Sequence, residues 1–128
     1  MDLANRLKIA RDTENAILIS IHMNAFPEEK YSGLQVYYSK NSPSSASLAK
    51  LIQEMNKSIL SPDNNRKTKQ AEKNIYLLDR FEGTAILIEC GFLSNASERD
   101  RLNTAEYRKE LAACFFASVI KHISTEGK

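Results

Sequence analysis

The spacing of apolar and polar positions predicts a chain built from short helices and strands. Residues 3–15 carry apolar side chains at helical intervals behind Asp2, a candidate N-cap, so we expect a helix there. Residues 16–26 begin with a nearly continuous apolar run, which is typical of a strand buried on both faces of a parallel sheet. Residues 34–40 are rich in β-forming side chains and predict a second strand.

A serine-rich segment with a proline, residues 42–47, opens the next predicted element, an amphipathic helix that ends before Pro62. The segment 61–74 then contains turn formers, four basic residues and few large apolar groups, so we expect an exposed, mobile loop. The apolar positions that predict the helix are Leu48, Leu51, Ile52, Met55 and Ile59.

Two short apolar runs, 74–80 and 84–90, are interpreted as core strands. Beyond them, Asn95 and Glu98 have the spacing of a capping box that opens a short helix, and residues 105–122 predict a longer one. Strands interleaved with helices favour a single α/β domain, a mixed and mostly parallel sheet flanked by helices on both faces.

Composition excludes several function classes. The 128 residues carry a net charge of only +2, far from the basic balance of nucleic-acid binders, so we expect no nucleic-acid partner. Two cysteines, Cys90 and Cys114, lie in apolar surroundings and are expected to be buried free thiols. No apolar run is long enough for a membrane span, and the first residues lack a secretory signal.

Two titratable residues lie where the strands of an open α/β sheet usually place functional groups. His22 follows the run ILISI, and Glu89 ends the run AILIE. A neutral imidazole and a carboxylate base are what a metal-assisted hydrolase requires. The alternatives are structural: a hydrogen-bonded histidine at a strand end, and an ion pair of Glu89 with Arg66 or a lysine.

Two motifs resemble those of a known enzyme family. SIHMNA at residues 20–25 is followed by LIECGFLSN at 87–95, with GLQVYY and NIYLLDR in the intervening sequence. In this order they resemble the type 3, zinc-dependent N-acetylmuramoyl-L-alanine amidases over nearly all of the chain. The resemblance implies an amidase fold and a peptidoglycan hydrolase that cleaves the amide between N-acetylmuramic acid and the L-alanine of the stem peptide.

The resemblance also implies roles for individual residues. His22 matches a ligand of the catalytic Zn²⁺, and Glu89 matches the catalytic glutamate that moves protons between water and the leaving amine. Asn24 is a weaker candidate for orienting the loop or the substrate, with a turn role as its alternative. The partner implied is peptidoglycan, and the place of action is the bacterial cell wall or the extracellular space, with sporulation as a further association.

The chain departs from the family pattern at its zinc site. The Gly-rich DPGHGG motif and the metal-binding glutamate after it have no counterpart, so we expect residues 1–128 to be the C-terminal portion of the amidase domain, without its N-terminal strands. His122, on the last predicted helix, is expected to be a surface or helix-end residue. Thr84 replaces a frequent proline and is expected to change only a turn. The acidic residues without a family match are Asp2, Glu14, Glu28 and Glu29.

Other hypotheses remain open at this point. The chain on its own is either an active hydrolase or a non-catalytic module that binds wall material or a partner protein. A nucleophilic Cys90 is a third, remote alternative.

Missing strands would leave an exposed sheet edge, which favours a homodimer. The basic segment 66–73 either faces an anionic wall polymer or is a solvated loop.

Overall fold

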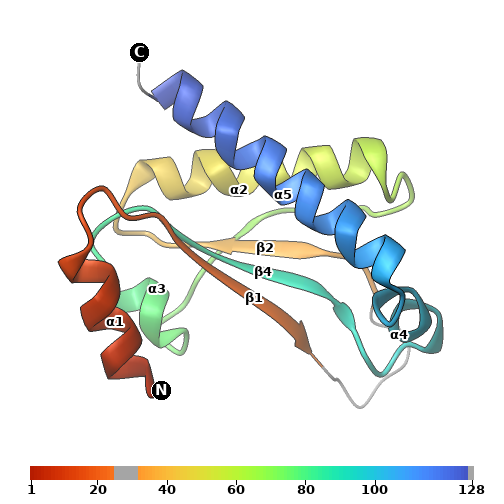
Figure 1. The fold of residues 1–128 in the computed structure, drawn as a ribbon, viewed down its shortest axis with the longest axis horizontal. Coiled ribbons are helices and arrows are strands. Elements are labelled where there is room, and N and C mark those ends of the chain that lie inside the picture. Colours follow the sequence, from red (N-terminus) through yellow and green to blue (C-terminus); the bar gives the residue numbers. More distant parts are fainter. Residues whose placement is uncertain (25–31, 127–128) are drawn as a thin grey trace.

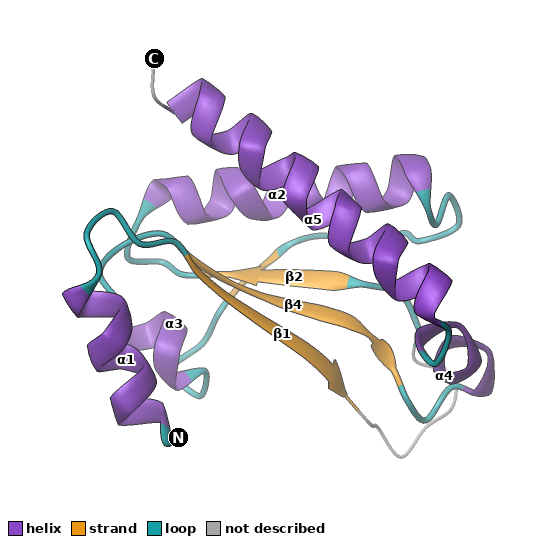
Figure 2. Cartoon of the chain, in the orientation of Figure 1, coloured by secondary structure: helices purple, strands orange, loops and turns teal. Residues whose placement is uncertain are grey.

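The structure is a computed structural model that describes residues 1–24 and 32–126, apart from the side chain of Asn24. Helices and strands are interleaved along the chain, as Figures 1 and 2 show. In chain order they are α1 (Leu3–Asp12), β1 (Leu18–Asn24), β2 (Gln35–Tyr38), α2 (Pro43–Ile59), β3 (Lys69–Gln70), α3 (Tyr76–Arg80), β4 (Ala85–Phe92), α4 (Ala96–Leu102) and α5 (Ala105–Glu126).

The four strands form one mixed sheet in the order β1-β4-β2-β3. β1 runs parallel to β4, β2 runs antiparallel to β4, and β3 runs parallel to β2. β4 therefore lies inside the sheet, and most of its side chains are buried. This arrangement confirms the predicted mixed α/β sheet.

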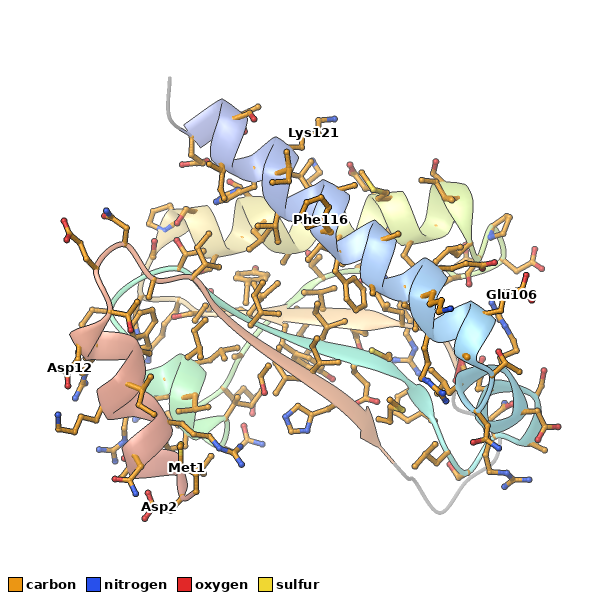
Figure 3. All side chains as sticks on the ribbon, viewed as in Figure 1. Met1, Asp2, Asp12, Glu106, Phe116 and Lys121 are labelled. Carbon is orange, nitrogen blue, oxygen red and sulfur yellow. The ribbon has the colours of Figure 1, made fainter. Side chains whose placement is uncertain are left out.

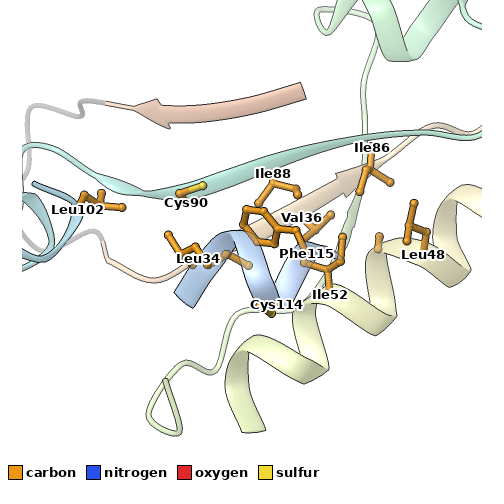
Figure 4. Packing of buried hydrophobic residues seen from close by; sticks show 12 residues of the cluster. Leu34, Val36, Leu48, Ile52, Ile86, Ile88, Cys90, Leu102, Cys114 and Phe115 are labelled. Carbon is orange, nitrogen blue, oxygen red and sulfur yellow. The ribbon is translucent and has the colours of Figure 1, made fainter. Parts of the chain in front are cut away.

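Helices cover both faces of the sheet, as predicted (Figure 1). α2 and α5 pack on one face, where aliphatic side chains of β2 and β4 meet Leu48, Ile52 and Phe115 (Figure 4). α1 and α3 pack on the other face, over a smaller cluster that includes Leu7 and Leu78. We call these the α2/α5 face and the α1/α3 face.

Helix starts follow the local sequence signals. The Asp2 carboxylate accepts a hydrogen bond from the backbone N–H of Asn5 at 2.8 Å, and Pro43 occupies the first turn of α2. At α4 the Asn95 side chain accepts from the backbone N–H of Glu98 at 3.2 Å. The three predicted helix starts are confirmed.

The strand predicted at 74–80 is wrong, because this segment forms the short helix α3. Leu77 and Leu78 point into the cluster under α1, and Phe81 joins them from the next turn. A short apolar run fits a buried helical turn as well as a strand, and Leu77, Leu78 and Arg80 are good helix formers.

Four smaller expectations also need correction. The strand predicted within 16–26 is not buried on both faces, because β1 is the edge strand of the described sheet and Ile21 and Met23 are 56% and 43% exposed. The segment 61–74 is not all exposed loop, because it contains β3 and the buried residues Asn64 and Ala71. Ile59 lies on the exposed side of the end of α2. His122 is buried, only 3% exposed, because α5 continues past it to Glu126 and turns it toward α2.

Within the described residues, none of the helices is both long enough and apolar enough to cross a membrane.

The Thr84 hydroxyl is hydrogen-bonded to Ser44, and its carbonyl accepts from the N–H of Leu18 at 3.0 Å. Thr84 therefore connects the turn before β4 to α2 and to the start of β1.

Candidate active site

The two residues singled out in the sequence lie side by side in the sheet. β1 and β4 are parallel neighbours, and their register pairs His22 with Glu89. On the other side of β4, Gln35 of β2 is paired with Glu89. Paired residues of neighbouring strands point to the same face, so these three side chains form one polar row across the sheet.

The polar row belongs to the α1/α3 face. Ile86, Ile88 and Cys90 of β4 pack in the cluster under α2 and α5, so the alternate residues Leu87 and Glu89 point the other way. Helices α1 and α3 cover this face beside the first halves of β1 and β4. They do not cover the polar row, which lies further along these strands. Here Glu89 is 1% exposed, whereas His22 is open to solvent.

A serine orients the imidazole. Ser20 lies two residues before His22 on the same face of β1, and its Oγ is 2.8 Å from His22 Nε2. A hydrogen bond to one ring nitrogen fixes the rotation of the ring and directs the other nitrogen elsewhere, as is usual for histidines that bind metals. Because alternate residues of a strand point to the same face, the two-residue spacing of Ser20 and His22 in the sequence already places both side chains together.

The other end of the row is anchored by Arg66, one of the basic residues of segment 61–74. The Gln35 Oε1 accepts from Arg66 Nη1 at 3.1 Å, and the Gln35 amide donates to the carbonyl of Lys67 at 2.8 Å. Arg66 also donates to the carbonyl of Ser32 at 2.6 Å and lies 5.0 Å from the ring centroid of Phe92. Arg66 is therefore a structural element of the site rather than a solvated charge.

Glu98 connects the segment just before β2 to the last residue of β4. Its carboxylate accepts from the N–H of Gly33 at 2.7 Å and from the N–H of Phe92 at 3.0 Å. Gly33 has a φ of 95°, a backbone conformation that side chains disfavour. The capping-box spacing located Glu98 correctly, but its contact with Gly33 depends on tertiary structure.

Cys90 is excluded as a nucleophile. Its thiol lies on the α2/α5 face, opposite Glu89, and both cysteines are buried and free. Burial raises the pKa of the Cys90 thiol to about 12, and the charge of Glu89 acts in the same direction. A thiol with this pKa is almost entirely protonated near neutral pH, so it is a poor nucleophile.

The described residues include no group of three His, Cys, Asp or Glu side chains that could hold a metal ion. Asp2 is used as the N-cap of α1, and His122 lies on the α2/α5 face, away from His22. Glu14 is exposed in the turn before β1. Asn24 ends β1, but its side chain lies outside the described part of the chain, as do Glu28 and Glu29.

The polar row can therefore support hydrolysis in one specific way. An exposed imidazole offers a metal ligand, and a buried carboxylate beside it offers a proton acceptor. The structure brings His22 and Glu89 together as the sequence motifs imply.

Comparison with known proteins gives one family. The family model described as N-acetylmuramoyl-L-alanine amidase matches residues 1–121. The germination-specific N-acetylmuramoyl-L-alanine amidase of Bacillus subtilis (strain 168) is 33% identical over 126 residues, which are 98% of this chain and 52% of that protein. The chain thus spans about half the length of this relative.

Solved structures agree with the sequence comparison. The CwlD amidase of Clostridioides difficile, solved in complex with the GerS lipoprotein, has a TM-score of 0.90 and 37% identity, over 96% of this chain and 62% of that one. The N-acetylmuramoyl-L-alanine amidase AmiC2 of Nostoc punctiforme has a TM-score of 0.87 and 26% identity, over 97% and 67% of the two chains.

Proposed function

Because this chain belongs to the N-acetylmuramoyl-L-alanine amidase family, we propose that it carries catalytic residues of a peptidoglycan hydrolase. The bond cleaved is the amide between N-acetylmuramic acid and the L-alanine of the stem peptide. The observation that carries this proposal is the pairing of His22 with Glu89 in the second halves of two parallel strands. Residues 1–128 are then the C-terminal portion of the catalytic domain.

Glu89 is the proposed general base and acid. Its buried carboxylate takes a proton from the water that attacks the lactyl carbonyl, and the same proton then goes to the alanine nitrogen as the C–N bond breaks. The products are a lactyl carboxylate and a free alanine amine. The burial of Glu89, which is 1% exposed, strengthens its interactions with the reacting groups.

His22 is the proposed zinc ligand in this chain, with Ser20 orienting its ring. A bound zinc ion would polarise the scissile carbonyl and make water acidic near neutral pH. Among the described residues no group of three His, Cys, Asp or Glu side chains forms a complete metal site. Asn24 stays a proposed substrate contact at the end of β1.

Zinc affinity tests the metal assignment. We expect His22→Ala to weaken Zn²⁺ binding by at least about tenfold, because a protein ligand is lost. The second histidine offers a matched control: His122→Asn changes the α2/α5 face and should leave the affinity unchanged. Competition with a chromophoric chelator measures both variants. The measurement uses the parent enzyme that contains this sequence, and equal zinc affinities in wild type and His22→Ala would contradict the assignment of His22 as a ligand.

We also propose that the chain self-associates through β1. In the described residues β1 is an edge strand, and its Ile21 is 56% exposed on the face that carries α5. α5 adds an outward apolar stripe that includes Phe116, which is 69% exposed (Figure 3), Ile120 and Ile123. Open edges with exposed apolar side chains are prone to pairing.

Light scattering tests this self-association. We expect the molar mass to rise with protein concentration, and we expect Ile21→Lys to shift the equilibrium toward monomer. Ile59→Lys is a matched control, because Ile59 is 64% exposed at the end of α2, outside the proposed contact. A wild-type chain that stays monomeric at high concentration would contradict the proposal.

The cell wall is the proposed place of action, because the substrate is found there. The similarity to a germination-specific amidase supports an association with spore peptidoglycan.

A further inference from the structure

A groove on the α1/α3 face leads away from the candidate active site. It has a volume of about 480 Å³, and His22 and Ser20 lie in its wall. Leu87 and Tyr37 form part of its apolar lining, together with side chains of α3. This volume is in the range of sites that bind small molecules or short peptides. A substrate whose reacting amide lies beside His22 and Glu89 would therefore extend into it.

Two cationic side chains line the groove from different elements. Arg6 reaches it from α1, and Lys69 reaches it from β3. Arg6 also lines a second cavity of about 380 Å³ whose wall again includes His22, so Arg6 borders both cavities that His22 lines. Glu72 is the acidic residue of the groove lining, which leaves a net positive charge there.

Arg6 differs from the other basic residues of its helix. Lys8 forms an ion pair with Asp12, and Arg11 forms one with Glu82 at 2.7 Å. Arg6 makes no ion pair or side-chain hydrogen bond with any residue that the structure describes, and the same holds for Lys69 in that part of the chain. A guanidinium presents a planar set of donors that matches a carboxylate. The groove thus offers binding groups for an anion that the fold itself does not use.

We propose that this groove binds the peptide side of the substrate, and that Arg6, assisted by Lys69, holds a free carboxylate located within a few residues of the scissile amide. This inference rests on the proposed function, because that function places the amide beside His22 and Glu89. A peptide suits the lining better than a glycan strand, since carboxylates pair with the two cations and the apolar floor suits an alanine methyl. Arg6 and Lys69 are then specificity-determining residues.

The test uses binding rather than hydrolysis, so it does not depend on the activity of the chain. The probes are the dipeptide L-alanyl-glutamate and its diamide, in which both carboxylates are replaced by carboxamides. Titration of the ¹⁵N-labelled 128-residue chain, followed by NMR, gives a dissociation constant for each. We expect the dicarboxylate to bind about three- to tenfold more tightly than the diamide, with shifts that include Ser20, His22 and Tyr37.

Two variants separate the groove from general charge effects. Arg6→Gln should reduce the preference for the dicarboxylate to near unity, and Lys69→Gln should reduce it in part. Lys8→Gln removes the same charge from the same helix, but Lys8 lies outside the groove lining, so the preference should persist. N,N′-diacetylchitobiose, a neutral disaccharide, serves as the glycan probe and should bind less well than the dicarboxylate.

Several results would overturn the proposal: equal binding of dipeptide and diamide, an unchanged preference in Arg6→Gln, or tighter binding of the disaccharide. None of these would affect the assignment of Glu89, which is tested by hydrolysis. Conversely, if the chain binds the dicarboxylate through Arg6 but the parent enzyme does not hydrolyse peptidoglycan, the groove proposal holds and the proposed function is wrong.

Discussion

Replacement of Glu89 by glutamine is expected to lower amide hydrolysis by about 10²- to 10⁴-fold, the usual contribution of a general acid–base residue. Glutamine has nearly the same size and keeps the hydrogen-bonding capacity of the strand position, but it cannot accept a proton from water. The position is buried beside His22 and Gln35, so a carboxamide there should leave the sheet intact. The measurement is kcat/KM for a muropeptide, with the parent enzyme that contains this sequence.

Controls separate a catalytic effect from a structural one. Zinc affinity and thermal stability should be close to wild type in Glu89→Gln. The matched control is Glu54→Gln, because Glu54 is an exposed carboxylate on α2 that pairs with Lys50, on the opposite face of the sheet. If Glu89→Gln retained activity within a factor of about three, the general-base role would be wrong.

The second large effect concerns stability. Ile52→Ala is expected to reduce the free energy of unfolding by about 2–5 kcal/mol, since it removes a fully buried side chain and leaves a cavity. Ile52 is 0% exposed and packs between α2, the sheet and α5 (Figure 4). This cluster supports β4 from the face opposite Glu89, so the same change should also loosen the polar row.

Urea or guanidinium unfolding, followed by circular dichroism, measures this loss. Ile59→Ala is the matched control, because Ile59 lies two turns further along α2 but is largely exposed. Its effect should stay within about 0.5 kcal/mol. Similar losses in the two variants would show that the packing of α2 on the sheet is not as described.

The parts of the site that could be predicted from the sequence are those with a local pattern. His22 and Glu89 each follow an aliphatic run, and that pattern alone locates them in strands, although β1 continues past His22 to Asn24 and β4 past Glu89 to Phe92. Their pairing is different, because register depends on which strands are neighbours. β1 and β4 are separated by two helices and two strands in the chain and become adjacent only in the folded sheet.

Tertiary contacts also explain what the sequence did not show. The Glu98 carboxylate bridges Gly33 and Phe92, and nothing local to Glu98 indicates the segment that contains Gly33. His122 is buried because α5 extends past it and packs on α2; its helical spacing from the buried Phe115 and Ser118 carries this signal once the full length of α5 is known. Arg6 is one of several basic residues in α1, and only the folded structure shows that it lines the groove while Lys8 and Arg11 form ion pairs.

The most direct test of the central claim is the chemical identity of the new ends formed when the parent enzyme acts on peptidoglycan. Cleavage by this site predicts free N-terminal alanine in the released peptides, with no increase in reducing sugar ends, and almost no release by the Glu89→Gln variant. Mass spectrometry and amino-group labelling measure both kinds of end. New reducing ends without free alanine, or equal release of alanine by the Glu89→Gln variant, would contradict the account.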